Sequence, residues 1–457
     1  MSKAPRPFLW ERGGEAGVRG TSIHVRHYDI AIMGAGPAGS TAAILLARRG
    51  YDVVLVDRAR FPRDKVCGDY LTPGAVKFLR DEIGVEGQLL RAGAVRVERQ
   101  TVVTHGNRSF AGHVDAIACP RRVTDAVLVD EARRSGVDVI EGFHVRDILF
   151  DGHRVTGFSG KVDSPGAMPT ALGRHVLSDR LDVRARITIG ADGTHSLLAR
   201  RLGLVRPIPR LHRLVLSGYI DDTGNDMTMY LPVNRTDACC GLGPSDSTGK
   251  RNLTIVVPTS EATAIAAGRE HYFRDRLSTS FPHVPVAHFA WPPRTSIRNP
   301  IIGEGSLSDQ GRQRLRSTAC FGHRTKRAAA DGALLIGDAA TFIHPFTGEG
   351  VYYALEGARL AAAAVDEALQ VGDVSYRTLS AYDRARAKSL SPRYRLCDIV
   401  QHIVHSPRLL KVAAEILQKS PPLSNQIFST VGDITEPASL VSLANIASYL
   451  RPAPAVY

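Results

Sequence analysis

The sequence predicts an α/β fold with a doubly wound, mainly parallel sheet, an inserted and mostly antiparallel sheet, and a helical C-terminal region. Three observations support this prediction. An apolar strand, a glycine-rich loop, a helical pattern and a second apolar strand follow one another within residues 28–57, in the order of a parallel βαβ unit. Residues 95–118 alternate apolar and polar side chains, as antiparallel strands with one exposed face do. Alanine-rich helical patterns follow residue 351.

The bulk composition is that of a globular protein with two or three domains. The 457 residues are 44% hydrophobic and 23% charged. The six cysteines contain no Cys-x-x-Cys pair, so we expect neither a disulfide scaffold nor a metal site, and a reduced, cytoplasmic protein is the default. No run of about 18 apolar residues predicts a transmembrane helix.

The formal net charge is +13. No block of like charges and no basic–aromatic alternation indicates a nucleic-acid partner. The charge suits an anionic cofactor, and it also permits contact with an acidic carrier protein or the surface of an anionic membrane. We give more weight to a basic but ordinary surface. The oligomeric state is not predicted.

The first half of the chain supplies the first βαβ unit and its insertions. A flexible extension is expected over residues 1–27, followed by a strand over 28–33, a helix over 38–49 and a strand over 51–56. After a loop over 60–74 we expect, in order, antiparallel strands over 95–118, a helix over 121–135, a strand over 137–150, a hairpin or surface insertion over 163–178, a strand over 181–189 and a helix over 196–202.

The second half begins with a mixed region over 206–291. The elements expected here are strands over 226–231 and 253–257, a helix over 260–280, a linker over 292–330, a strand over 333–336, a helix over 351–369, and helices near 375–390, 392–418 and 439–450.

The first motif is the loop Gly34-Ala35-Gly36-Pro37-Ala38-Gly39. Gly34 permits the tight turn, Gly36 lets the backbone approach a pyrophosphate, and Gly39 lets the helix pack on the strand. Asp57 ends the next strand, where a carboxylate can accept hydrogen bonds from an adenosine ribose. The context predicts a dinucleotide site rather than a tight turn in an unrelated α/β fold.

The second motif, Asp192-Gly193, lies between a predicted strand and a predicted helix. Asp-Gly pairs are common turn formers, so alone it indicates little. Its position between the other two motifs in chain order makes it a candidate part of the same site.

The third motif runs from Gly337 to Gly350 and follows the apolar run at 333–336. Asp338 stands at the end of the expected strand, and Gly348, Glu349 and Gly350 open a helix. Such an acid can hold sugar-like hydroxyls, and backbone N–H groups at a helix start can hold an electron-rich ring edge. Together they suit the ribityl chain and the pyrimidine edge of a flavin.

In this order, the three motifs resemble those of FAD-dependent oxidoreductases in the group A flavoprotein monooxygenase and geranylgeranyl reductase-like superfamily. The resemblance covers about residues 27–435. It implies an FAD-binding domain of the Rossmann-like, glutathione-reductase type. Only one glycine fingerprint is present, so NADPH or another reductant is expected as a transient donor without a domain of its own.

The resemblance also implies cofactor contacts at matching positions. Arg121 matches an arginine that reaches the ribityl chain or the pyrophosphate, Val145 a strand residue whose backbone meets the adenine, and Arg58 a residue packed near the adenosine. The full set of implied cofactor-binding residues is Gly34, Ala35, Gly36, Pro37, Ala38, Gly39, Asp57, Arg58, Arg121, Val145, Asp192, Gly193, Gly337, Asp338, Gly348, Glu349 and Gly350.

The loop over 64–74 contains Cys67-Gly68-Asp69 and is similar to the Cys-Gly-Asp/Gly loop of the geranylgeranyl reductase-like branch. The resemblance places Cys67 near the isoalloxazine as the candidate catalytic residue, where a thiol can donate a proton or tune the ring. The alternative role is a small, soft packing residue beside the flavin.

Two tryptophan patterns of related enzymes are absent from the sequence. The branch carries a Tyr-x-Trp-x-aromatic-Pro box on its substrate sheet, but the matching stretch here, residues 228–232, has no tryptophan. The two-tryptophan motif of flavin halogenases is also absent, because Trp10 and Trp291 stand alone.

The motifs and the alternating patterns together suggest four regions. These are an N-terminal extension (1–27), a discontinuous FAD-binding domain (28–92, 119–205 and 331–372), a substrate-binding domain (93–118 and 206–330) and a C-terminal helical region (373–457).

The activity implied is that of an FAD-dependent oxidoreductase acting on a large, hydrophobic small molecule, in isoprenoid metabolism or natural-product tailoring such as antibiotic biosynthesis. A geranylgeranyl reductase-like enzyme would reduce a carbon–carbon double bond. Two alternatives stay open: a monooxygenase that hydroxylates or epoxidises through a C4a-peroxide, and a non-redox cyclase in which FAD only shapes the pocket for a polyene.

Overall fold

The structure is a computed structural model that describes residues 24–104, 108–163, 180–221, 224–231, 239–245, 249–281, 284, 315–320, 322–343 and 348–441. Four sequence expectations lie wholly or largely outside these residues. They are most of the extension over 1–27, the insertion over 163–178, most of the linker over 292–330 and the end of the helix over 439–450.

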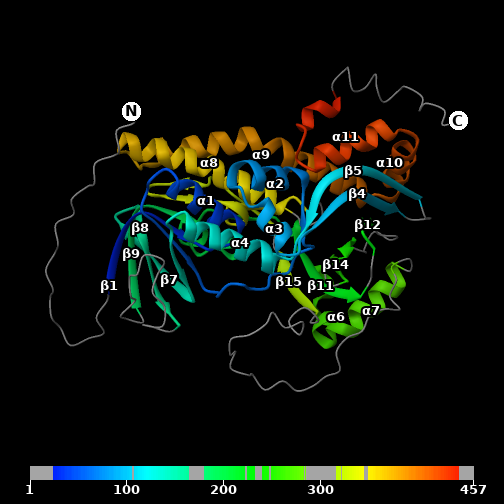
Figure 1. The fold of residues 1–457 in the computed structure, drawn as a ribbon, viewed down its shortest axis with the longest axis horizontal. Coiled ribbons are helices and arrows are strands. Elements are labelled where there is room, and N and C mark those ends of the chain that lie inside the picture. Colours follow the sequence, from blue (N-terminus) through cyan, green and yellow to red (C-terminus); the bar gives the residue numbers. More distant parts are fainter. Residues whose placement is uncertain are drawn as a thin grey trace.

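The first sheet is the doubly wound sheet that the sequence predicts. Its strands run in the order β17-β18-β9-β1-β2-β6, and the neighbours from β18 to β6 are parallel. The antiparallel strands β7 and β8 continue from β9 (Figure 1). The bounds are β1 (His24–Met33), β2 (Val53–Asp57), β6 (Asp138–Glu141), β7 (Phe143–Asp151), β8 (Arg154–Val162), β9 (Arg180–Gly190), β17 (Ala329–Ala330) and β18 (Ala333–Leu335).

Strand order alone brings the three motifs together. Met33 at the end of β1 pairs with Gly190 at the end of β9, and Gly190 also pairs with Leu335 at the end of β18. The loops that follow these parallel strands therefore leave the same edge of the sheet, side by side. This edge is where ligands bind in open α/β sheets.

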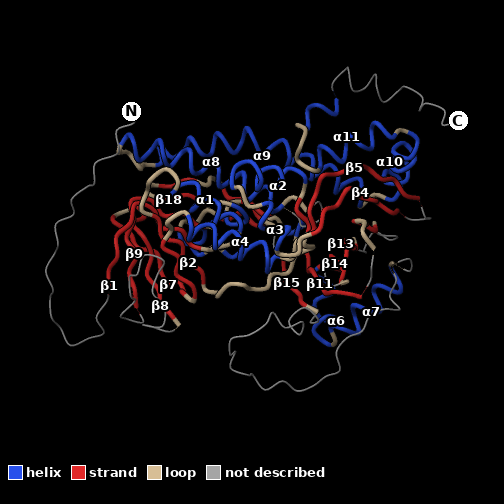
Figure 2. The backbone as a smooth tube through the Cα atoms, in the orientation of Figure 1, coloured by secondary structure: helices blue, strands red, loops and turns tan. Residues whose placement is uncertain are grey.

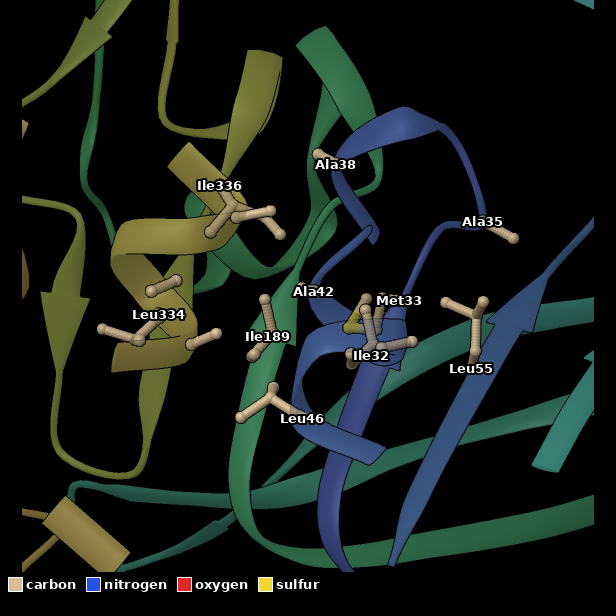
Figure 3. Packing of buried hydrophobic residues seen from close by; sticks show 14 of the residues in the cluster. Ile32, Met33, Ala35, Ala38, Ala42, Leu46, Leu55, Ile189, Leu334 and Ile336 are labelled. Atoms are coloured by element: carbon tan, nitrogen blue, oxygen red, sulfur yellow. The ribbon is translucent and has the colours of Figure 1, made fainter. Parts of the chain in front are cut away.

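Helices α1 (Pro37–Ala47), α4 (Arg121–Arg134) and α8 (Gly350–Val371) pack beside this sheet, and α1 contacts both α4 and α8. The core between them is aliphatic. Figure 3 shows Ile189 and Ile32 of the strands near Leu46 of α1, with Leu55 on the far side of Ile32, and all four side chains are fully buried. Burying such side chains contributes about 1.5–3 kcal/mol each, so this core fixes the edge that carries the motifs.

The second sheet is mostly antiparallel, with the strand order β15-β11-β14-β13-β12-β4-β5-β3; only β12 and β4 pair in parallel. Figure 2 shows it beside the first sheet, with helices on its outer side. The bounds are β3 (Tyr70–Leu71), β4 (Val95–Thr104), β5 (Arg108–Ala118), β11 (Arg213–Asp221), β12 (Met227–Tyr230), β13 (Cys240–Ser245), β14 (Lys250–Pro258) and β15 (Arg316–Cys320).

Shorter elements connect the two sheets. A small third sheet contains β10, β16 and β19. The remaining bounds before the C-terminal region are α2 (Pro73–Phe78), η1 (Leu79–Ile83), α3 (Glu86–Arg91), η2 (Gly193–His195), α5 (Leu197–Arg201), β10 (Val205–Pro207), η3 (Pro209–Leu211), η4 (Thr259–Glu261), α6 (Ala262–Ala267), α7 (Arg269–Ser280), β16 (His323–Thr325), η7 (Gly337–Ala339) and β19 (Thr341–Phe342).

The C-terminal region consists of α9 (Tyr376–Val404), α10 (Pro407–Lys419), α11 (Pro421–Val431) and the short helix η8 (Pro437–Val441). Helix α9 packs on α8, while α10 and α11 pack on β5 (Figure 1). Within the described residues, no helix is both long and apolar enough to span a membrane.

The structure confirms the predicted fold class and corrects four element boundaries. Strand β1 begins at His24 rather than at residue 28, because β9 is long enough to pair with the polar residues that precede Tyr28. The helix expected over 260–280 is interrupted at Gly268, whose extended backbone (φ −176°, ψ 83°) cannot continue a helix. Residues 316–320, expected within a linker, form β15 because β11 offers them an unpaired edge.

The fourth correction concerns Pro392, where the sequence suggested a break between two helices. Helix α9 continues through Pro392, although proline removes one backbone hydrogen bond. The neighbouring residues Leu390, Arg393 and Cys397 are buried against the rest of the protein. Tertiary packing therefore outweighs the local cost. Helix α11 was not predicted as a separate element.

Candidate active site

In the glycine loop after β1, Gly34 and Gly39 pack tightly against backbone atoms, whereas Gly36 has open space beside it. A Cβ atom on Gly34 (φ +101°) would lie 2.4 Å from the carbonyl oxygen of Ala191, and one on Gly39 would lie 1.8 Å from that of Gly34. A Cβ atom on Gly36 would meet only the end of the Arg63 side chain, at 3.7 Å. The backbone of Gly36 is thus open to a ligand, as a pyrophosphate contact requires.

Asp57 braces this loop from the end of β2. Its Oδ2 accepts a hydrogen bond from Ala35 N at 2.8 Å, and its Oδ1 accepts one from Ala59 N at 2.8 Å. Each carboxylate oxygen has a second lone pair, so Asp57 can still hold a ribose hydroxyl. Arg58 is exposed beside it, and Val145 lies on β7, half-buried and paired with Gly160.

The Asp192 turn carries an unsatisfied buried oxygen. Its Oδ2 accepts a hydrogen bond from Leu197 N at 2.7 Å, but its Oδ1 is buried and has no partner in the described part of the protein. Burial raises the pKa of this carboxyl. Gly193 (φ +79°) has open space where a side chain would stand. A buried acceptor next to open space is a natural place for a ligand donor.

In the third motif the strand ends at Leu335, so Asp338 lies in η7 rather than at the strand end. The pKa of Asp338 is raised chiefly by burial, and the positive charges of Lys65, Arg121 and His323 act on it in the opposite direction. A Cβ atom on Gly337 (φ +56°) would lie 2.9 Å from Cβ of Ala38, so this turn packs closely on the start of α1.

At the start of α8, the backbone rather than a side chain faces open space. No atom of the described residues lies within 4 Å of where a Cβ of Gly350 would stand, and Gly348 has φ +76°. The Glu349 side chain is buried, and its Oε2 accepts hydrogen bonds from the hydroxyl of Tyr353 and from Cys397 Sγ, the latter at 2.6 Å. A cofactor contact by Glu349 would therefore come from its backbone.

Cys67 sits in a loop that the second sheet holds by its backbone. The carbonyl oxygen of Cys67 accepts hydrogen bonds from Ser217 Oγ at 3.2 Å, Asn252 Nδ2 at 3.1 Å and Thr254 Oγ1 at 3.5 Å. The three donors come from β11 and β14, where Ser217 pairs with Thr254. The position of the thiol is thus set by the second sheet as well as by its own loop.

Asp69, two residues later, is the most constrained member of this loop. It is buried with φ +55°, and its carboxylate accepts hydrogen bonds from the hydroxyl of Tyr219, from Asn252 Nδ2 at 2.8 Å and from Arg121 N at 3.1 Å. Despite these donors, burial raises the pKa of Asp69 to about 6. The backbone of Asp69 is thus strained, and the contacts of its carboxylate hold it in this conformation.

The sequence interpretation missed four polar residues of the second sheet: Ser217, Tyr219, Asn252 and Thr254. They occupy every second position in the middle of β11 and β14, and that spacing was a usable signal. What the sequence could not show is that this polar face meets the Cys67 loop.

Arg121 is the first residue of helix α4 and lies with the Cys67 loop in one cavity wall. Its guanidinium forms a bidentate ion pair with Asp125 (2.8 and 2.9 Å), and Arg63 binds the same carboxylate at 3.1 Å. Burial raises the pKa of the Cys67 thiol above its ordinary value, while the nearby positive charge of Arg121 lowers it. The thiol is therefore kept protonated beside a cation that would stabilise the thiolate.

A small cavity of about 30 Å³ separates this loop from the second sheet. Such a volume holds only one or two water molecules. Its wall combines loop residues, the start of α4 and the polar face of the sheet: Asp64, Lys65, Val66, Cys67, Asp69, Pro120, Arg121, Arg122, Ser217, Tyr219, Asn252 and Arg316.

The Asp69 carboxyl predicts a pH-dependent contribution to stability. Because its folded-state pKa of about 6 exceeds the ordinary value near 4, the folded state binds this proton more tightly. The contribution is present below pH 4 and is lost as the pH rises to 6, with a size on the order of 3 kcal/mol. Relative to Asp69→Asn, the wild-type free energy of unfolding should fall across this range. Urea titrations of both proteins at pH 4, 5, 6 and 7 measure the difference, and a constant or rising difference would contradict it.

The open positions fit FAD. Gly36, Gly193 and Gly350 all leave free space at the edge where β1, β9 and β18 end, and Asp192 offers an unpaired acceptor there. Asp57, Asp192 and Asp338 are the acids that a dinucleotide with two sugar-like chains requires along this edge. The fold and this site define the class of protein: a flavoprotein oxidoreductase.

Comparison with known proteins agrees. A family described as "FAD binding domain" matches residues 27–290. The chain belongs to this family, and its cofactor is FAD. It is an FAD-dependent oxidoreductase of the superfamily that the three motifs resemble.

Curated relatives span most of the chain. "Menaquinone reductase" of Mycolicibacterium smegmatis is 29% identical, covering 89% of this chain and 91% of the relative. "Conditioned medium factor receptor 1" of Dictyostelium discoideum is 28% identical (86% and 74%). "Digeranylgeranylglycerophospholipid reductase" of Methanocella arvoryzae is 23% identical (86% and 91%). Among solved structures, the flavin-dependent brominase Bmp2 has the same fold, with a TM-score of 0.68 at 20% identity (93% of this chain, 99% of that chain).

Proposed function

We propose that the protein reduces a carbon–carbon double bond of a large, apolar, isoprenoid-like molecule. The observation that carries this proposal is the Cys67 thiol, whose pKa is raised by burial and which lies with Arg121 in the wall of the small cavity between its loop and the second sheet. A proton donor at this place is what reduction of a double bond needs in addition to a hydride. The similarity to reductases of menaquinone and of a digeranylgeranyl lipid supports an isoprenoid substrate.

In this proposal, different residues at the edge where β1, β9 and β18 end bind different parts of FAD. The backbone of Gly36 and the Asp192 turn would hold the pyrophosphate, and Asp57, Arg58 and Val145 would hold the adenosine. Asp338 would bind the ribityl hydroxyls. The N–H groups from Gly348 to Gly350 would bind the pyrimidine edge. Arg121 is committed to Asp125, so it acts on the flavin and on Cys67 through its charge.

The chemistry that FAD would supply here, once reduced by a donor such as NADPH, is a hydride for one carbon of the double bond. The Cys67 thiol gives its proton to the other carbon, and the resulting thiolate is stabilised by the Arg121 guanidinium until it regains a proton from water. Ser217, Asn252 and Thr254 fix the Cys67 backbone, so the thiol keeps one orientation during the transfer.

An anaerobic assay tests this function. The FAD-loaded protein is mixed with NADPH or dithionite and with menaquinone or a digeranylgeranyl lipid, and the products are analysed by mass spectrometry. We expect products that have gained two hydrogens without oxygen. Products that form only in air and contain a new oxygen atom would instead establish a monooxygenase. An isomeric product formed without any donor would establish a non-redox cyclase, and either result would refute the reductase.

A further inference from the structure

The outer side of the cavity is strongly basic. We call Lys65, Arg122 and Arg316, which all contribute to its wall, the cationic rim. They come from the Cys67 loop, the second position of α4 and the first position of β15. Asp64 is the only carboxylate of the wall at this side, since Asp69 is enclosed by Tyr219 and Asn252. Three cations and one carboxylate leave a net charge of +2.

The Asp64 carboxylate lies closer to Arg316 than to Arg122. Arg316 binds Asp64 Oδ2 at 2.6 Å, whereas Arg122 Nη1 lies 3.9 Å from the same oxygen. Arg122 Nε is buried and has no hydrogen-bond partner in the described part of the chain. A buried guanidinium N–H without an acceptor is costly, so an acceptor from outside would stabilise this arrangement.

The rim is separate from the contacts expected for the FAD pyrophosphate. The cavity wall includes no residue of the glycine loop over 34–39. The cation nearest to Gly36 is Arg63, which belongs to the Asp125 ion pair. The rim residues instead share the cavity wall with Cys67, and their side chains remain 28% (Arg122) and 32% (Arg316) exposed, so a ligand can reach them from outside.

We propose that the cationic rim binds a phosphate group of a ligand on the outer face of the Cys67 loop. The planar, forked guanidinium groups of Arg122 and Arg316 match phosphate oxygens, and a net charge of +2 suits a phosphate dianion better than a carboxylate. Two ligands of the proposed reductase carry this chemistry: a nicotinamide dinucleotide donor, and an isoprenoid with a phosphate or diphosphate head. The inference thus rests on the proposed function for its choice of ligands, but not for its binding test.

Inorganic pyrophosphate is the probe. It is titrated into the FAD-loaded protein by isothermal titration calorimetry, without turnover. Arg122→Gln and Arg316→Gln should each raise the Kd about tenfold, as expected for loss of one charge-assisted contact. Asp64→Asn removes the competing carboxylate and should lower the Kd. The control is Arg324→Gln, whose side chain pairs with Asp398 away from the cavity and should leave the Kd unchanged.

Two further binding measurements identify which ligand supplies the phosphate. A parallel loss of affinity for NADPH in the Gln variants identifies the donor, whereas a loss for farnesyl diphosphate but not for farnesol identifies the substrate. If pyrophosphate does not bind, or binds equally to the wild type and both variants, the proposal that the rim binds phosphate is refuted. Loss of FAD from the Gln variants also overturns it, because the arginines would then serve the cofactor. Binding results remain interpretable even if no double bond is reduced.

Discussion

Replacing Gly36 with valine is expected to give a folded protein that retains almost no FAD. Gly36 has φ −74° and ψ −175°, a backbone conformation open to any residue, and its Cβ would meet only the flexible end of Arg63. The fold should lose about 1 kcal/mol or less. The valine side chain, however, occupies the space through which the pyrophosphate approaches the backbone.

Two hydrogen bonds to charged oxygens, at about 1.5–3 kcal/mol each, would be lost or bent. The Kd for FAD should therefore rise by at least about 100-fold. The ratio of flavin to protein absorbance after purification measures occupancy, and circular dichroism with urea titration checks the fold. Full occupancy in the Gly36→Val protein would contradict the assignment of this loop.

Gly39→Ala is the matched control, because the same loop should respond in the opposite way. A Cβ on Gly39 would lie 1.8 Å from the carbonyl oxygen of Gly34, and both atoms belong to backbone that cannot move aside. We expect a loss of more than about 3 kcal/mol in the free energy of unfolding, or no soluble protein. The pair thus separates the glycine that packs from the glycine that binds.

The second large effect is expected for Cys67→Ala. If the thiol supplies the proton, its removal should lower the rate constant for substrate reduction by on the order of 10²- to 10⁴-fold. Reduction of the bound flavin by the donor, followed by its absorbance under anaerobic conditions, should be unchanged. The wild-type rate should stay flat beyond the ordinary thiol pKa near 8.5, because burial raises the pKa of Cys67.

Cys320→Ala provides the control. Cys320 is half-buried on β15, and burial raises its pKa to about 12, so a general loss of thiols is separated from the loss of this one. Wild-type turnover in the Cys67→Ala protein would show that Cys67 only packs beside the flavin. A variant that has also lost flavin reduction would show that Cys67 positions the ring instead.

The sequence determined the parts of this protein that depend on local geometry. Gly34, Gly36 and Gly39 each have the backbone space that their spacing predicts, because a tight turn between a strand and a helix admits few conformations. The meeting of the three motifs could also be predicted, since parallel strands end at one edge of a sheet. Element boundaries were less reliable where packing competes with local preference, as at Pro392 and in β15.

Only the tertiary structure decided the chemistry beside Cys67. Tyr219 and Asn252 reach Asp69 across 150 and 183 residues of sequence, and no local pattern specifies which polar face of a sheet will meet which loop. The same holds for Arg122 of α4 and Arg316 of β15, which both approach Asp64. The charge balance, burial and pKa values of these side chains depend on these distances, so they are set only when the two sheets pack together.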